Sequence, residues 1–175
     1  MGLVCNCLLY LILFAECGLS LECKPSNFKI LVCSGLYFAW LILDNIDGKQ
    51  ARKTRTSSPL GLMCDHQVDA LTVTIACTFM GIITLYGNSW YTIGIYFVGM
   101  IPFFFATWEE YHVGAMEFPM INGACDGCLI LGVIGTVIGV FGPDYFRENT
   151  FMGVELIHLM FWFFIVASIL TGLYK

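Results

Sequence analysis

Six long apolar runs dominate this chain of 175 residues, and each is close to the length that crosses a bilayer. A membrane core requires about 20 residues of helix, and its lack of water forces backbone polar groups to pair within the protein. With 58% hydrophobic and only 12% charged residues, the composition excludes an ordinary soluble domain. We therefore expect an all-α fold, a polytopic membrane helical bundle with about six transmembrane helices, over residues 1–19, 28–46, 61–86, 90–107, 124–141 and 151–173.

The segments between and within these runs are consistent with the same helical bundle. Residues 142–149 (GPDYFREN) are expected to form a loop, and residues 1–175 are interpreted as a single membrane domain. Glycines repeat along residues 124–141, which predicts close helix packing. The nine cysteines are scattered, mostly in apolar runs, and are interpreted as small hydrophobic residues. Cys125 and Cys128 form one CDGC pair without a second pair, so no zinc site is expected.

One stretch, residues 43–70, departs from this pattern because it holds four aspartates and a group of basic residues. Ionised carboxylates near a bilayer core are costly, so their presence indicates a functional site. On a helix that turns about 100° per residue, Asp44, Asp47, Gly48 and Ala51 fall within an arc of roughly 100°. Two carboxylates thus share a helix face with two small residues, which leave room for a ligand.

A second acidic face follows in the next segment, where Gly61, Asp65 and Asp69 lie on a stripe of about 80°. Between the two faces, KTRTSSPL is typical of a short connector, and Pro59 suits the first turn of a helix. Two helices joined by a short connector become antiparallel neighbours. All four aspartates can therefore converge.

Four convergent carboxylates repel one another unless a cation binds between them. Oxygen ligands suit Mg²⁺ or Mn²⁺, and two such ions about 3.5–4 Å apart can clamp a phosphoryl group during its displacement. We therefore expect a site for a pair of divalent cations that acts on a phosphate ester. The basic residues nearby either hold further phosphate oxygens or are the positive charges typical of a cytosolic loop; they are Lys49, Arg52, Lys53 and Arg55.

The spacing of these residues resembles the signature of the CDP-alcohol phosphotransferase family. In this chain the pattern runs D-x2-DG-x2-AR-x8-G-x3-D-x3-D over residues 44–69. The surrounding sequence is similar to that of the eukaryotic choline/ethanolamine phosphotransferases. The similar segments are DGKQARKT, SSPLG, ATWEEY at residues 106–111 and ING at residues 121–123. The resemblance implies transfer of phosphocholine or phosphoethanolamine from CDP-choline or CDP-ethanolamine to diacylglycerol, with release of CMP, in phospholipid biosynthesis.

The resemblance also implies roles for individual residues. The implied metal ligands are Asp44, Asp47, Asp65 and Asp69. The residues implied to contact the CDP-alcohol are Gly48, Ala51, Arg52 and Gly61.

The acceptor hydroxyl needs a base, for which there are two candidates. Asp69 is the family-wide candidate, and His66 is typical of the eukaryotic branch. Because a histidine titrates near a pKa of about 6.5 while bound cations depress the pKa of a carboxylate, we predict that His66 takes the proton. One departure bears on this prediction. Leu62 stands where eukaryotic relatives commonly have a glutamate that could assist the histidine.

An even number of spans separates the basic residues into two groups. One side carries Lys49, Arg52, Lys53, Arg55 and Lys175, and the other carries Lys24, Lys29 and Arg147. The positive-inside rule assigns the first group, and with it the acidic site, to the cytosol. We expect an integral membrane protein of the endoplasmic reticulum or Golgi. Its expected partners are the CDP-alcohol, diacylglycerol and membrane lipid, and no nucleic acid is expected to bind. Whether the chain forms a homodimer is left open by the sequence.

Three alternatives remain open at this point. A CDP-diacylglycerol-dependent phosphatidyltransferase shares the metal motif but not the ATWEEY context. A cation transporter explains acids in a membrane but not the spacing of the glycine, alanine and arginine. A catalytically impaired or regulatory fragment is the third, because the Pro-Asn…Thr element that precedes the first helix in family members is missing, and we expect truncation at both ends. Choline versus ethanolamine, acyl preference and Mg²⁺ versus Mn²⁺ are not decided by the sequence.

Overall fold

The computed structural model describes residues 2–18, 21–56, 58–114 and 123–173, apart from the side chains of residues 52, 123–125 and 167–173. Within these ranges nearly all residues are helical, which confirms the all-α prediction. The elements in chain order are α1 (Gly2–Cys17), α2 (Asn27–Thr54), α3 (Pro59–Ile83), α4 (Trp90–Val113), α5 (Gly123–Phe141), α6 (Pro143–Glu148), β1 (Thr150–Phe151), β2 (Val154–Glu155) and α7 (Leu156–Leu173).

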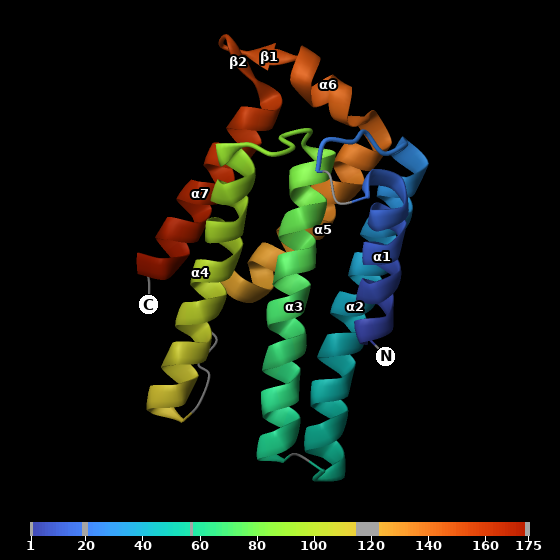
Figure 1. Cartoon of the computed structure of the whole chain (residues 1–175). Helices are drawn as coiled ribbons and strands as arrows, with labels where there is room; N and C mark the ends of the chain where they lie inside the picture. Colours follow the sequence, from blue (N-terminus) through green and yellow to red (C-terminus); the bar gives the residue numbers. More distant parts are fainter. Residues whose placement is uncertain (1, 19–20, 57, 115–122, 174–175) are drawn as a thin grey trace.

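The long helices stand side by side, and successive ones run in opposite directions (Figure 1). Among the described residues, α2, α3 and α4 are each long and apolar enough to cross a membrane, and α1, α5 and α7 contribute shorter apolar stretches. Large side chains of α4 point outward, with Phe97, Phe104 and Phe105 all more than half exposed. Apolar surface of this extent suits contact with lipid rather than water.

Close approach of α5 to α2 depends on the predicted glycines. A methyl group at Gly132 would lie 2.8 Å from the ring of Phe38, and one at Gly135 would lie 2.8 Å from Oγ of Ser34. At Gly139 the same addition would come within 2.9 Å of another side chain of α2. Glycine lets helix backbones approach closely where lipid provides no hydrophobic drive for association. The prediction of close packing along this helix is confirmed.

The expected loop over residues 142–149 is wrong, because the structure has the short helix α6 there. Gly142 precedes it with a φ of 85°, and Pro143 occupies the first helical turn, where its missing N–H costs nothing. Asp144 lies in the first turn and Arg147 in the last, so both charges complement the helix dipole. The glycine and proline that indicated a loop are thus the start of a short helix.

Other helix bounds also differ from the predicted runs. Helix α2 extends eight residues beyond the expected residue 46, to Thr54, since DGKQARKT contains good helix formers. Helix α4 extends to Val113 rather than residue 107, and ends at Gly114 in the left-handed conformation. Helix α7 starts later than residue 151, because strands β1 and β2 pair there as a small antiparallel hairpin.

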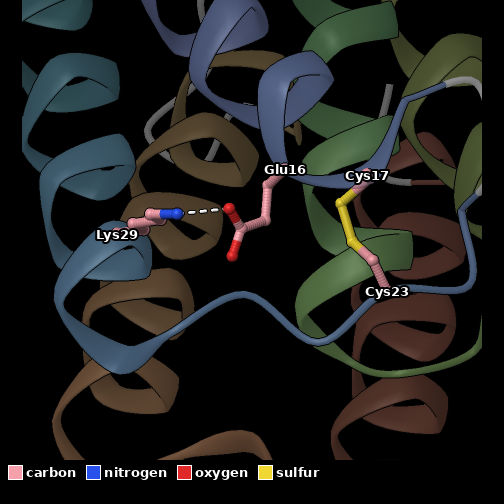
Figure 2. The surroundings of a disulfide bond; sticks show 4 residues. All are labelled: Glu16, Cys17, Cys23 and Lys29. Atoms are coloured by element: carbon pink, nitrogen blue, oxygen red, sulfur yellow. Dashed lines mark hydrogen bonds and ion pairs between the residues drawn. A yellow bond between two sulfur atoms is a disulfide. The ribbon is translucent and has the colours of Figure 1, made fainter.

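A disulfide joins Cys17 to Cys23 across the connection between α1 and α2 (Figure 2). An ion pair between Lys29 and Glu16 lies beside it and links the same two helices. These cysteines do not fit the interpretation of every cysteine as a small hydrophobic residue. The spacing of six residues between two apolar runs allowed a bridge, and nothing else in the sequence indicated one.

The end of the bundle that holds the disulfide also gathers basic residues of the described part of the chain. Lys24 pairs with Asp144 of α6, and Arg147 donates a 2.6 Å hydrogen bond to the carbonyl of Leu85. These contacts tie α6 to the α1–α2 and α3–α4 connections. The turn between α2 and α3 lies at the opposite end of the bundle (Figure 1).

Candidate active site

The acidic site is built on the sharp turn between α2 and α3. Helix α2 ends with Arg55 in the left-handed conformation, at a φ of 57°, and the N–H of Thr56 donates to the carbonyl of Ala51 at 3.1 Å. This is the hydrogen-bond pattern of a Schellman helix end. Helix α3 then starts at once, because Oγ of Ser58 accepts from the N–H of Gly61 at 3.1 Å, and a proline follows at the first helical position.

The tight turn sets the four aspartates at matching depths on the two helices. Asp47 lies seven residues before the end of α2, and Asp65 lies six residues after the start of α3. At 1.5 Å per residue, both stand roughly 10 Å from the turn. Asp44 and Asp69 are each ten residues from their helix ends, or roughly 15 Å along the axis.

Three of the four predicted acids come together. Asp44, Asp47 and Asp65 each offer a carboxylate oxygen, and these oxygens all lie within 4.8 Å of one another. Asp44 is partly buried, whereas Asp47 and Asp65 are exposed. The group thus faces the space beside the α2–α3 hairpin and can be reached by a soluble ligand.

Asp69 stands apart from this group of three, although its carboxylate interacts electrostatically with those of Asp44, Asp65 and Asp47. It lies one turn beyond Asp65 on the same stripe of α3, a rise of about 6 Å along the helix. Asp69 is partly buried and lies further into the apolar span. Asp69 lies next to the three-carboxylate group but is not one of the three residues whose oxygens converge within 4.8 Å.

The residues implied to contact the nucleotide have mixed surroundings. Gly48 and Ala51 are both partly exposed on α2, one turn beyond the acids or less. Gly61 has a visible structural role, since a methyl group there would lie 3.2 Å from Oγ of Ser58, the residue that caps α3. Arg52 belongs to α2, but its side chain lies outside the described part of the structure.

His66 is turned toward α4 rather than toward the acids of α2. Its Nε2 lies 3.1 Å from Oε2 of Glu110, which belongs to the ATWEEY run near the end of α4. Both side chains are mostly buried, with exposed fractions of 28% for His66 and 19% for Glu110. Leu62, one turn before His66, is about half exposed. The carboxylate beside the histidine therefore comes from a neighbouring helix and not from position 62.

The three-carboxylate group has the chemistry of a divalent cation site. Hard oxygen donors from two helices suit Mg²⁺ or Mn²⁺, and like charges this close together favour a bound cation. Asp44, Asp47 and Asp65 would hold the ion, with Asp69 near enough to affect it. The donor atoms of these described side chains therefore fit a divalent cation.

The fold and this site define an integral membrane protein with an acidic cluster suited to divalent cations at one end of its bundle. A model of the CDP-alcohol phosphatidyltransferase family matches residues 2–172, so the chain belongs to this family. The predicted resemblance to the family is thereby confirmed, and the chain is an integral membrane protein of this family.

Several curated relatives carry more specific names. The chain is 41% identical over 162 residues to a cholinephosphotransferase 1 of Xenopus laevis, covering 89% of this chain and 39% of that protein. It is 35% identical over 174 residues to a cholinephosphotransferase 1 of Gallus gallus, covering 98% of this chain and 50% of the relative. A choline/ethanolaminephosphotransferase 1 of Arabidopsis thaliana is 32% identical over 136 residues, covering 78% and 34%. The chain thus spans half or less of the length of these relatives.

Sequence reasoning did not pair His66 with Glu110. The two residues are 44 positions apart, and their contact depends on how α3 and α4 pack, which no local pattern encodes. The available signal was the ATWEEY run itself, which places two glutamates in an apolar helix. A mostly buried carboxylate requires a partner, and that requirement points to a nearby histidine or cation.

Proposed function

We propose that the chain transfers phosphocholine or phosphoethanolamine from a CDP-alcohol to diacylglycerol, with release of CMP. The observation that carries the proposal is the convergence of Asp44, Asp47 and Asp65 within 4.8 Å in a member of this family. The names of the relatives support the choice of choline or ethanolamine as the headgroup.

Binding of the donor is assigned to the end of α2. A divalent cation held by the aspartates supplies neutralisation of the diphosphate charge and stabilisation of the departing CMP. Gly48 and Ala51 leave room beside the acids for the nucleotide, and Arg52 is proposed to hold a phosphate. Helix α2 has 28 residues and is about 42 Å long, which exceeds the roughly 30 Å membrane core. Its last turns can therefore reach the aqueous phase, where a soluble donor is available.

The acceptor step is assigned to His66. The diacylglycerol hydroxyl loses its proton to the imidazole as its oxygen forms a bond to the phosphorus that carries the alcohol headgroup. The bond from that phosphorus to the oxygen of CMP breaks, and the electron pair leaves with CMP. General-base assistance of this kind is worth ~10²–10⁴ in rate. Asp69 is proposed to support the metal ligands rather than to take the proton.

We further propose that the acidic site faces the cytosol and that the membrane is the endoplasmic reticulum or Golgi. The disulfide between Cys17 and Cys23 supports this orientation, because disulfides persist in oxidising compartments such as the lumen. It lies at the opposite end of the bundle from the α2–α3 turn (Figure 1). The basic residues at the disulfide end are engaged in ion pairs or hydrogen bonds, as with Lys24 and Arg147, whereas Lys53 and Arg55 lie exposed at the other end.

The proposal is tested by following a labelled headgroup into lipid. The full chain is reconstituted in vesicles that contain diacylglycerol and Mg²⁺, and is given CDP-choline or CDP-ethanolamine labelled in the headgroup. We expect labelled phospholipid and an equal amount of CMP from wild type and none from Asp65→Asn. Activity only with CDP-diacylglycerol as donor, or cation flux without CMP release, would contradict the proposal.

A further inference from the structure

An apolar cavity lies among α3, α4, α5 and α7, and its lining includes Met80, Ile95, Ile134 and Met160. Its lining residues on α3 begin at Cys77, so it lies in the half of the bundle far from the α2–α3 turn (Figure 1). With a volume of about 40 Å³, it has room for about three water-sized groups at roughly 10–15 Å³ each. Cavities with apolar walls stay dry and take up apolar molecules.

Close helix contacts bound this cavity on two sides. A methyl group at Gly99 of α4 would lie 2.7 Å from Sγ of Cys77 in α3, and one at Gly94 would lie 2.9 Å from the ring of Phe161 in α7. Val98 lies between these two glycines on α4 and lines the cavity. The space is therefore set by the packing of α4 against two neighbouring helices.

Hydrogen bonds close the end of the cavity toward the disulfide. Tyr86 lines the cavity there and is buried, and its hydroxyl donates to the carbonyl of Ile157 at 3.2 Å. The same hydroxyl lies 3.0 Å from Nδ1 of His158. An apolar chain that enters from the side of the acidic site would stop against this ring, because the polar groups behind it are already paired.

We propose that the cavity receives the end of one acyl chain of the diacylglycerol acceptor and sets a preference for chain length, an inference that rests on the proposed function. Cys77 lies twelve residues beyond Asp65 on α3, about 18 Å along the helix axis. Three bonds of extended chain span ~3.3–3.6 Å, so a chain of eighteen carbons reaches roughly 20 Å and one of twelve carbons roughly 13 Å. From a hydroxyl held beside Asp65, only the longer chain reaches the cavity.

The energetic basis of the preference is packing and not removal from water. An acyl chain in the bilayer already lies among hydrocarbon, so its transfer into the protein adds little hydrophobic drive. The walls of an empty cavity lack van der Waals partners, and a chain end that fills the cavity supplies them. Only a chain long enough to reach the cavity obtains this gain.

Chain-length kinetics test the proposal. The full chain in vesicles is given CDP-choline, Mg²⁺ and either dioleoylglycerol or dilauroylglycerol. We expect wild type to favour dioleoylglycerol at least ~3-fold in kcat/KM. Val98→Phe, which fills the cavity, should bring this ratio close to one while KM for CDP-choline stays within about twofold. The matched control Val140→Phe, on an exposed position of α5, should keep the wild-type ratio. A ratio close to one in wild type, or the same ratio in Val98→Phe, would overturn the proposal.

Photocrosslinking of wild type tests the location whether or not the chain turns over. A diacylglycerol with a diazirine at the end of one eighteen-carbon chain is irradiated with the reconstituted chain and Mg²⁺ in the absence of CDP-choline. We expect the label on cavity residues such as Met80 and Met160, with competition by dioleoylglycerol but not by dilauroylglycerol. Label confined to exposed residues such as Phe97 and Phe105 would overturn the proposal.

The same diazirine on a phosphatidylcholine chain separates the acceptor from the surrounding lipid. Label on the cavity from this phospholipid, with none from the diacylglycerol, would overturn the proposal in favour of a bound bilayer lipid. Cavity label from the diacylglycerol without any CMP release on addition of CDP-choline would contradict the proposed function alone.

Discussion

Removal of one acid from the site should stabilise the chain when no divalent cation is present. Asp44, Asp47 and Asp65 have oxygens within 4.8 Å of one another. At 4.8 Å, Coulomb's law gives a repulsion of about 1 kcal/mol per pair in water and about 3.5 kcal/mol at an effective dielectric constant near 20. Asp65→Asn removes two of the three repulsive pairs, so the relief is about 2–7 kcal/mol if all three carboxylates are ionised.

The advantage of the variant should shrink when the cation is supplied. In chelator, we expect Asp65→Asn to melt about 4 °C or more above wild type, since 1 kcal/mol corresponds to roughly 2–4 °C for a chain of this size. Mg²⁺ at 100 times its dissociation constant should stabilise wild type by about 2.7 kcal/mol and the variant much less.

Thermal unfolding in lipid nanodiscs, followed by tryptophan fluorescence, measures both effects. Glu148→Gln, which removes a charge at the disulfide end, is the control and should change neither value. A variant that is less stable than wild type in chelator, or equal stabilisation of both proteins by Mg²⁺, would show that the three acids do not share a cation.

Three further outcomes are expected. His66→Ala should lower kcat by ~10²–10⁴ while Mg²⁺ affinity, measured by calorimetry, stays near wild type, and an unchanged rate would transfer the role of base to Asp69. Gly135→Val should destabilise the bundle by about 1–3 kcal/mol or more in thermal unfolding, because even a Cβ added at this position would lie 2.8 Å from a side chain of α2. Wild-type stability of this variant would refute the close contact. In sealed microsomes, a membrane-impermeant maleimide should label Cys17 and Cys23 only after reduction and permeabilisation, and labelling from the cytosolic side would invert the proposed orientation.

The sequence was sufficient for the helical fold and for the convergence of three acids, because both depend on local periodicity. Asp44 and Asp47 share a helix face by spacing alone, and the capped turn at Ser58 brings Asp65 alongside them. Asp69 was predicted to join the group, and the cluster within 4.8 Å contains the other three acids. Asp69 is as far from its helix end as Asp44 is, so matching depth and a shared face do not by themselves guarantee a common ligand sphere.

Features that depend on contacts between distant segments were not predictable from local patterns. The pairing of His66 with Glu110 follows from the packing of α3 on α4, and the bridge from Cys17 to Cys23 follows from the path of the connection after α1. The short helix α6 was missed for a different reason. Its glycine and proline indicate a loop when read alone, yet both are favourable at a helix start.

The central claim is that the acids of α2 and α3 hold a divalent cation against the diphosphate of a CDP-alcohol. Electron–nuclear double resonance on Mn²⁺ bound to the reconstituted chain tests it most directly, because the spectrum reports phosphorus nuclei close to the metal. On addition of CDP-choline we expect a ³¹P coupling in wild type that is absent in Asp65→Asn. Bound Mn²⁺ without a ³¹P coupling in wild type, or the same coupling in Asp65→Asn, would contradict the claim.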